Sequence, residues 1–251
     1  MKIIKQVLTI FSLLTLSYNL SSGQDALTIV RKADEKMRGN TAMVEMTINT
    51  IRPAWKRSMQ LKVWSKGTDY SMVLITSPAK DKGVSFLKRK KEVWNWYPTL
   101  ERVIKLPPSM MSQSWMGTDF TNDDLVRESS VINDYTHKLT GDTLIGGRSC
   151  YKIEMIPKQQ AAVVWGKLNV CIDKKDYIEL HIRFYDEEGV LVNVMNGFDP
   201  RAMGGRVIPT RFEMIPVDKK GQKTEMIYRS IVFDKPIKDD FFNLNTMKNL
   251  R

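Results

Sequence analysis

The sequence predicts a mainly β protein with few helices, in which a single antiparallel sheet curls into an incomplete (half) barrel of about eleven strands. Three observations predict this fold. Most of the chain consists of short runs in which apolar and polar residues alternate, the pattern of strands with one buried face. One amphipathic helix precedes these runs, and one apolar segment of irregular structure interrupts them. The alternation alone is equally compatible with a closed eleven-stranded barrel or a sandwich.

The first 23 residues predict a signal peptide for export. Two lysines precede a mostly apolar run at residues 7–16, and small residues follow up to Gly23, as a signal peptidase requires. We expect cleavage between Gly23 and Gln24, with an uncleaved anchor as the alternative, although the apolar run is short for a membrane span. Residues 24–251 then form one domain, because they contain no linker and no internal repeat.

The chain is basic, with a formal net charge of +11. A positive surface favours anionic partners such as lipid head groups. However, the basic residues are spread along the sequence, with one tight run at residues 88–91, so an evenly charged soluble surface is the simpler interpretation. No helix-turn-helix, zinc-finger or RNA-binding aromatic motif occurs, and we therefore expect no nucleic-acid partner.

Residues 25–38 form the clearest predicted helix. Asp25 can cap its start, and Gly39 can end it in a left-handed conformation. The apolar residues recur at helical spacing and define one stripe, which we expect to lie on the sheet. The stripe consists of Ala26, Ile29, Val30, Ala33 and Met37.

The alternating runs predict the strands in order. They lie near residues 44–48, 59–63, 70–74, 92–97, 148–156, 165–173, 178–184, 190–194 and 208–214. One apolar face per strand indicates a sheet around a single interior. The candidate cavity-wall residues are Tyr70, Met72, Leu74, Trp94, Trp96, Ile153 and Leu168. The alternation does not show which face of the strand at 92–97 is inside, so ordinary packing of both tryptophans is the simpler interpretation and a place on the cavity wall the more specific one.

The cysteines Cys150 and Cys171 lie on a predicted hairpin. If strands 148–156 and 165–173 pair about a turn near residues 160–161, Cys150 faces Cys171 on the polar, outer face. Directly opposed residues are close enough for a disulfide, and an exported protein meets an oxidising compartment. We expect a Cys150–Cys171 disulfide, with two free, partly buried thiols as the alternative.

Residues 107–120 carry large apolar side chains on irregular backbone, because Pro107 and Pro108 block strand pairing and resist helix formation. The side chains are Met110, Met111, Trp115, Met116 and Phe120. Methionine-rich surfaces bind variable apolar ligands, so this segment is a candidate lid or mouth of a ligand site. The alternative is a loop folded inward as a plug of the core.

A helix start follows this segment. Thr121 and Asp124 have the spacing of a capping box, and Phe120 and Leu125 occupy the positions of a hydrophobic staple. The nearby acidic residues lack the spacing of a calcium loop, so we expect no metal site.

Catalytic motifs are absent from the sequence. The two histidines, His137 and His181, lie on predicted strands without a nucleophile motif nearby. We expect neither an enzyme nor a cofactor.

The motif WMGTDFTNDDL at 115–125, which PPSMM precedes at 107–111, resembles the outer-membrane lipoprotein-sorting protein family, the LolA-like group. The resemblance continues in DTLIGGRSCYKIEMIPK (142–158), LNVCIDKKDYIELHIRFYDEEGVLV (168–192), VIPTRFEMI (207–215) and DDFFNL (239–244). It implies a half-barrel whose open mouth is covered by helices and loops.

The same resemblance implies a function. It indicates a monomeric periplasmic carrier or chaperone that binds acyl chains of lipoproteins or lipids for transfer toward the outer membrane. An inner-membrane exporter and an outer-membrane acceptor would be its further partners. An acyl chain of about 14 carbons gains roughly 11 kcal/mol on leaving water, so it needs such shelter. The alternative is a lipid- or lipoprotein-sensing binding module, or an accessory partner of an RND-type envelope exporter.

Overall fold

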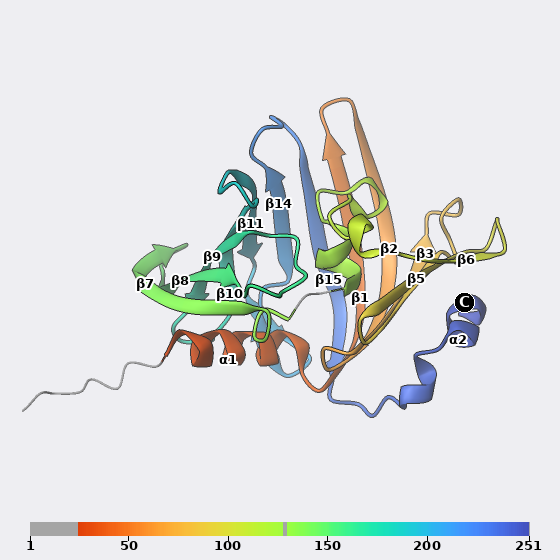
Figure 1. Ribbon diagram of the computed structural model, residues 1–251, viewed down its shortest axis with the longest axis horizontal. Helices are drawn as coiled ribbons and strands as arrows, with labels where there is room; N and C mark the ends of the chain where they lie inside the picture. Colours follow the sequence, from red (N-terminus) through yellow and green to blue (C-terminus); the bar gives the residue numbers. More distant parts are fainter. Residues whose placement is uncertain (1–24, 128–129, 251) are drawn as a thin grey trace, which may run out of the picture.

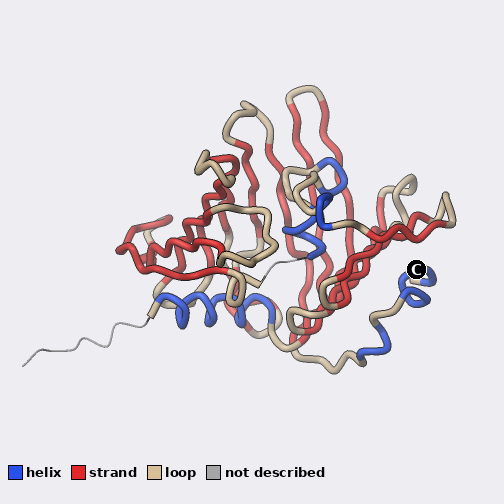
Figure 2. The backbone as a smooth tube through the Cα atoms, viewed as in Figure 1, coloured by secondary structure: helices blue, strands red, loops and turns tan. Residues whose placement is uncertain are grey.

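The computed structural model describes residues 25–127 and 130–250, so the predicted signal peptide lies outside the described residues. Thirteen strands form one antiparallel sheet, in the order β6-β5-β4-β3-β2-β1-β15-β14-β11-β10-β9-β8-β7. The sheet curls without closing, and its edges are β6 and β7 (Figures 1 and 2). This confirms a mainly β protein built on one large antiparallel sheet that is not closed into a barrel.

The first half of the sheet is built from β1 (Thr41–Arg52), β2 (Trp55–Lys66), β3 (Tyr70–Ser77), β4 (Ser85–Arg89), β5 (Glu92–Tyr97) and β6 (Arg102–Lys105). The second half is built from β7 (Tyr135–Ile145), β8 (Arg148–Pro157), β9 (Lys167–Asp173), β10 (Glu179–Tyr185), β11 (Leu191–Phe198), β14 (Arg211–Pro216) and β15 (Lys223–Phe233). A separate two-stranded sheet pairs β12 (Arg201–Met203) with β13 (Arg206–Ile208).

The prediction of about eleven strands was too low. The edge strands β6 and β7 have largely exposed side chains. Their hydropathy therefore alternates only weakly, and the sequence pattern does not reveal them.

The predicted N-terminal helix is confirmed as α1 (Ala26–Arg38). The Asp25 carboxylate accepts a hydrogen bond from the Thr28 backbone N–H at 2.6 Å. At the other end Gly39, with φ of 64°, donates its N–H to the Glu35 carbonyl at 2.9 Å. Because both signals act within four residues, local sequence is sufficient to specify them. In Figure 1 the helix runs beneath the second half of the sheet.

The C-terminal segment covers the convex face of β3, β4 and β5. It contains η4 (Asp239–Phe241) and α2 (Leu244–Asn249), and Phe242 and Met247 are fully or almost fully buried. The Phe242 ring stacks on Tyr70 with ring centroids 5.3 Å apart. This part of the sheet is therefore buried on both faces.

Most of the residues expected on the cavity wall lie beneath this C-terminal segment instead. Tyr70, Met72, Trp94 and Trp96 belong to the cluster beneath the C-terminal segment, on the convex side of the sheet. Leu74 is buried, but it is not among the residues that line the cavity. These residues lie on the other face of the sheet from the cavity because the opposite-parity residues, Val73 among them, are also apolar and take the inner positions. Alternation cannot identify the inner face of a strand that is buried on both sides.

The β8–β9 hairpin exists, but its register differs by two residues from the predicted one. Cys150 faces Asp173, and Cys171 faces Lys152. Both cysteines are free and buried, so the predicted disulfide was wrong. The shift arises because Trp165 does not pair within β9, which begins at Lys167, but packs into the core. A shift of two residues keeps every side chain on its expected face.

Neither thiol is expected to react quickly in the folded protein. Burial, together with the charges of Asp173 and Cys171, raises the pKa of Cys150 to about 11. At pH 8 the reactive thiolate should be on the order of a hundredfold scarcer than in a free cysteine. We expect iodoacetamide to label both cysteines only after unfolding, without added reductant, as mass spectrometry can measure. Protection that persists in denaturant until reductant is added would instead demonstrate a disulfide.

Candidate functional site: an apolar cavity under a lid

A cavity of about 320 Å³ lies inside the curled sheet. Its walls are mainly apolar side chains of the concave face, from both halves of the sheet. They include Val63, Val73, Leu168, Met195, Phe212 and Tyr228. Leu168 is thus the predicted wall residue that lines the cavity, whereas Ile153 lies in the surrounding core cluster.

Residues 107–127, called the lid below, cover the open side of the sheet (Figure 1). The lid contains η1 (Pro108–Met110), η2 (Trp115–Gly117) and η3 (Asp123–Arg127). Trp115 and Phe120 line the cavity, and the Trp115 ring packs against Phe86 with centroids 5.3 Å apart. The lid therefore closes the cavity with aromatic side chains that are themselves part of the core.

The three lid methionines do not line the cavity. Met111 is buried in the core cluster, and Met110 and Met116 are half-buried against it. The structure thus combines the two sequence interpretations of this segment, because it is a cover whose apolar side chains are folded inward.

The predicted capping box is present at the end of the lid. The Thr121 backbone N–H donates to the Asp124 carboxylate at 2.8 Å, and the Asp124 N–H donates to the Thr121 hydroxyl at 3.1 Å. The helix that follows, η3, has π-helical rather than α-helical hydrogen bonding. Phe120 and Leu125 both line the cavity, so the staple positions point to the interior as expected.

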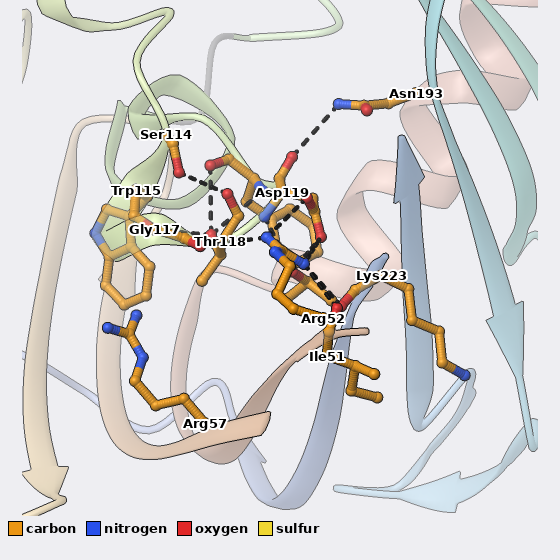
Figure 3. A network of polar contacts seen from close by, with 12 residues as sticks. Ile51, Arg52, Arg57, Ser114, Trp115, Gly117, Thr118, Asp119, Asn193 and Lys223 are labelled. Atoms are coloured by element: carbon orange, nitrogen blue, oxygen red, sulfur yellow. Dashed lines mark hydrogen bonds and ion pairs between the residues drawn. The ribbon is translucent and has the colours of Figure 1, made fainter. Parts of the chain in front are cut away.

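A polar latch fastens the lid to the sheet (Figure 3). Arg52, the last residue of β1, donates two hydrogen bonds of 2.9 Å to the two carboxylate oxygens of Asp119. The Thr224 hydroxyl on β15 donates to Asp119 at 2.7 Å and accepts the Asp119 N–H at 2.9 Å. The Arg52 and Asp119 side chains are only 12% and 7% exposed, so this pair is largely withdrawn from water.

Further hydrogen bonds hold the lid at residues 116–117, where both residues have a backbone conformation with positive φ. Met116 has φ of 52° and Gly117 has φ of 74°. This conformation costs a non-glycine residue roughly 1–2 kcal/mol. Arg57 of β2 donates to the Met116 carbonyl, and Arg52 donates to the Gly117 carbonyl at 3.3 Å. Two arginines of adjacent strands therefore stabilise a strained part of the lid.

Sequence reasoning missed the latch arginines. Asp119 is one of the acidic residues near the capping box that the sequence suggests only as a comparison with a calcium loop, and its partner Arg52 lies 67 residues earlier. No local pattern links the two positions. The position of Arg52 at the end of a strand, directly before Pro53, is the available signal, and it is weak.

Polar groups also border the cavity. The Trp165 indole N–H donates to the Asp124 carboxylate at 3.0 Å, and the Tyr135 hydroxyl donates to the Trp165 carbonyl at 3.2 Å. Burial raises the pKa of Asp124 above its usual value. Burial also raises the pKa of Tyr135, and the negative charges of nearby carboxylates act in the same direction. At the α1 side of the cavity, Arg38 and Asp34 form an ion pair of 2.7 Å.

The raised pKa of Asp124 predicts a pH-dependent stability. A carboxyl group that holds its proton more tightly when folded stabilises the fold at low pH, and this contribution is lost as pH rises through the raised pKa. We therefore expect the difference in Tm, native protein minus Asp124→Asn, to be larger at about pH 5 than at about pH 7.5. Thermal melts followed by circular dichroism measure this difference. A difference that does not change with pH would contradict the assignment.

The histidines lie away from the cavity. His137 contacts the Val131 carbonyl at 2.7 Å, and His181 contacts the Asn196 side chain at 2.8 Å. Within residues 25–127 and 130–250, no group of three His, Cys, Asp or Glu side chains is arranged to hold a metal ion. No helix in this part of the chain is long and apolar enough to cross a membrane.

Comparisons with known proteins give the following matches. A family model described as an uncharacterized protein matches residues 67–249. No curated protein matches the chain in a sequence search. A LolA superfamily protein from Nitrosomonas europaea superposes with a TM-score of 0.78 and 23% identity, covering 89% of this chain and 100% of that chain. A domain assigned to outer-membrane lipoprotein sorting, from Vibrio parahaemolyticus, superposes with a TM-score of 0.79 and 21% identity, covering 89% of this chain and 98% of that chain.

Proposed function

Since the chain belongs to this family of uncharacterized proteins and has the LolA-like fold, we propose that it is a carrier that shelters the acyl chain of a lipid or lipoprotein. The observation that carries the proposal is the apolar cavity between the sheet and the lid. A cavity of about 320 Å³ is at the small end of ligand sites. A long acyl chain would therefore occupy it only after part of the lid has moved.

The chemistry of the cavity fits such a cargo. Sheltering one methylene group is worth about 0.8 kcal/mol, so an apolar wall without specific polar contacts is sufficient for affinity. Methionine side chains such as Met195 and Met226 contribute to the wall and can adapt to chains of different shape. In this proposal the latch holds the lid closed over the cavity.

The proposed route of the cargo rests on the signal peptide that the sequence predicts. In this proposal the N-terminal 23 residues direct export to the periplasm, and the chain then moves acylated cargo from an inner-membrane donor toward an outer-membrane acceptor. It binds cargo as a monomer and uses neither a cofactor nor a catalytic residue.

Native mass spectrometry of the chain purified without detergent tests the proposal, together with displacement of a fluorescent fatty acid. Met195→Glu places a charge on the cavity wall, and Val63→Trp fills the cavity with an apolar side chain. Each variant should weaken fatty-acid binding at least tenfold. The glutamate leaves a charge that a bound acyl chain would bury, and the tryptophan occupies volume that the acyl chain needs.

Ile104→Glu is the matched control, because Ile104 is 43% exposed on β6 and does not line the cavity. It should bind like the native chain. The proposal fails if the native chain binds no acyl probe, or if all three variants bind it equally well.

A further inference from the structure

Two β-turns meet at the end of the sheet where the lid is latched. One joins β1 to β2 around Pro53, and the other joins β14 to β15 around Gly221. Ile51 pairs with Lys223 across β1 and β15, and a Cβ atom at Gly221 would lie 3.5 Å from the Pro53 ring. Figure 1 shows both turns projecting at the top of the molecule, beyond the lid. They therefore form one continuous surface.

This surface exposes large apolar side chains. Trp55 is 50% exposed and Val217 is 49% exposed. The other five tryptophans are buried or half-buried, so Trp55 is the most water-exposed indole of the chain. An indole at the tip of a hairpin is poorly hydrated and contributes nothing to the core. Exposed apolar side chains that gather in one place are typical of a contact surface.

Lysines surround the two apolar residues. Lys56, Lys219 and Lys220 are exposed, and Asp218 is the single acidic residue of the two turns. The Arg52 guanidinium lies over the Trp55 ring, 5.8 Å from its centroid. The residues Trp55, Lys56, Val217, Lys219 and Lys220 are called the tip surface below.

We propose that the tip surface docks the protein on an anionic lipid bilayer. Tryptophan prefers the membrane–water interface because its ring is apolar and its N–H can still bond to water or head groups. Lysine side chains extend their charge to phosphate groups while their stems lie along apolar surface. An exposed tryptophan flanked by three lysines therefore matches the chemistry of an anionic lipid surface.

The neighbouring turns support one orientation on the membrane. The turn between β10 and β11 carries Glu187 and Glu188 and lies lower in Figure 1 than the two tips. An anionic surface would repel this acidic turn, so the bilayer contacts the tips of the β1–β2 and β14–β15 hairpins first. Arg52 and Arg57 of the β1–β2 hairpin and Thr224 of the β14–β15 hairpin all bond to the lid, so docking brings the lid close to the bilayer. The proposal goes beyond cargo binding and does not require a filled cavity.

Co-sedimentation of the purified chain with lipid vesicles tests the proposal. Vesicles of phosphatidylcholine with about 30 mol% phosphatidylglycerol provide the anionic surface, and pure phosphatidylcholine provides the neutral one. Changing Lys56, Lys219 and Lys220 together to glutamine should lower the partition coefficient about a hundredfold, from about fivefold for each lysine. Trp55→Ala should lower it roughly tenfold and abolish quenching of tryptophan fluorescence by brominated lipid.

Matched variants control for charge and for apolar exposure. Lys138, Lys158 and Lys235 are exposed elsewhere, and their triple change to glutamine gives the same net charge. Leu144→Ala removes an apolar side chain that is 71% exposed near the end of the remote edge strand β7. Both controls should bind like the native chain, and every variant keeps the same N-terminal segment. Equal losses in both lysine triples, binding that does not depend on the tip surface, or a Trp55-dependent dimer without vesicle binding would each overturn the proposal.

Discussion

Replacing Arg52 by alanine is expected to weaken the closed lid by about 3–5 kcal/mol, because it leaves the Asp119 carboxylate largely buried without its cationic partner. The Thr224 hydroxyl remains as a donor to Asp119, but it carries no compensating charge. If the lid opens as a local unit, the loss will appear mainly in the lid. Hydrogen exchange followed by mass spectrometry measures this local opening. The Trp115 backbone N–H donates to the Phe120 carbonyl at 2.8 Å, and in Arg52→Ala it should exchange at least a hundredfold faster than in the native chain.

Two controls separate the latch from a general effect of charge. Arg52→Lys keeps the charge but loses the two-pronged contact with Asp119, so its effect should be intermediate. Lys62→Ala breaks an exposed pair with Glu45, whose side chains are 45% and 54% exposed, and such pairs contribute only about 0–1 kcal/mol. Similar exchange rates in the Arg52→Ala and Lys62→Ala proteins would show that the latch does not hold the lid.

The contrast between the latch and the capping box shows what the sequence can predict here. Thr121 and Asp124 are three residues apart, so the chain brings them together whatever the rest of the fold does. The same holds for Asp25 and Thr28 at the start of α1. Arg52, Asp119 and Thr224 meet only because β1 and β15 are neighbours at the centre of the sheet. That neighbourhood is a property of the topology, which no local pattern encodes.

Strand pairing illustrates a second limit. For the β8–β9 hairpin the alternation correctly placed Ile153 and Leu168 on the inner face, but it fixed the register only to within two residues. Sliding by two residues preserves the buried face, and the longer loop around Trp165 decides between the two registers. On β5 the limit is different, because the C-terminal segment covers the convex face and buries Trp94 and Trp96 partly on the side opposite the cavity. The inner wall therefore required the tertiary structure.

Trp115→Ala is expected to lower the free energy of unfolding by about 3–5 kcal/mol, the usual cost of removing a fully buried large aromatic side chain. Trp115 is 0% exposed, and its ring packs on Phe86. Its indole N–H, however, is buried without a hydrogen-bond partner among the described residues. Trp115→Phe removes that unsatisfied donor, whose burial costs roughly 1–3 kcal/mol, and this gain offsets part of the lost packing. Urea unfolding should therefore show a much smaller effect for phenylalanine than for alanine.

The alanine variant also distinguishes a lid over a binding site from a plug in a core. Since Trp115 lines the cavity, its truncation enlarges the space available to an acyl chain. A ligand that binds only the folded state stabilises it by about 2.7 kcal/mol when its concentration is 100 times Kd. A saturating fatty acid should therefore recover a large part of the stability lost in Trp115→Ala, whereas a plug would leave nothing for the fatty acid to bind. Failure of any fatty acid to raise the urea midpoint of either the native chain or the alanine variant would identify Trp115 as core packing alone.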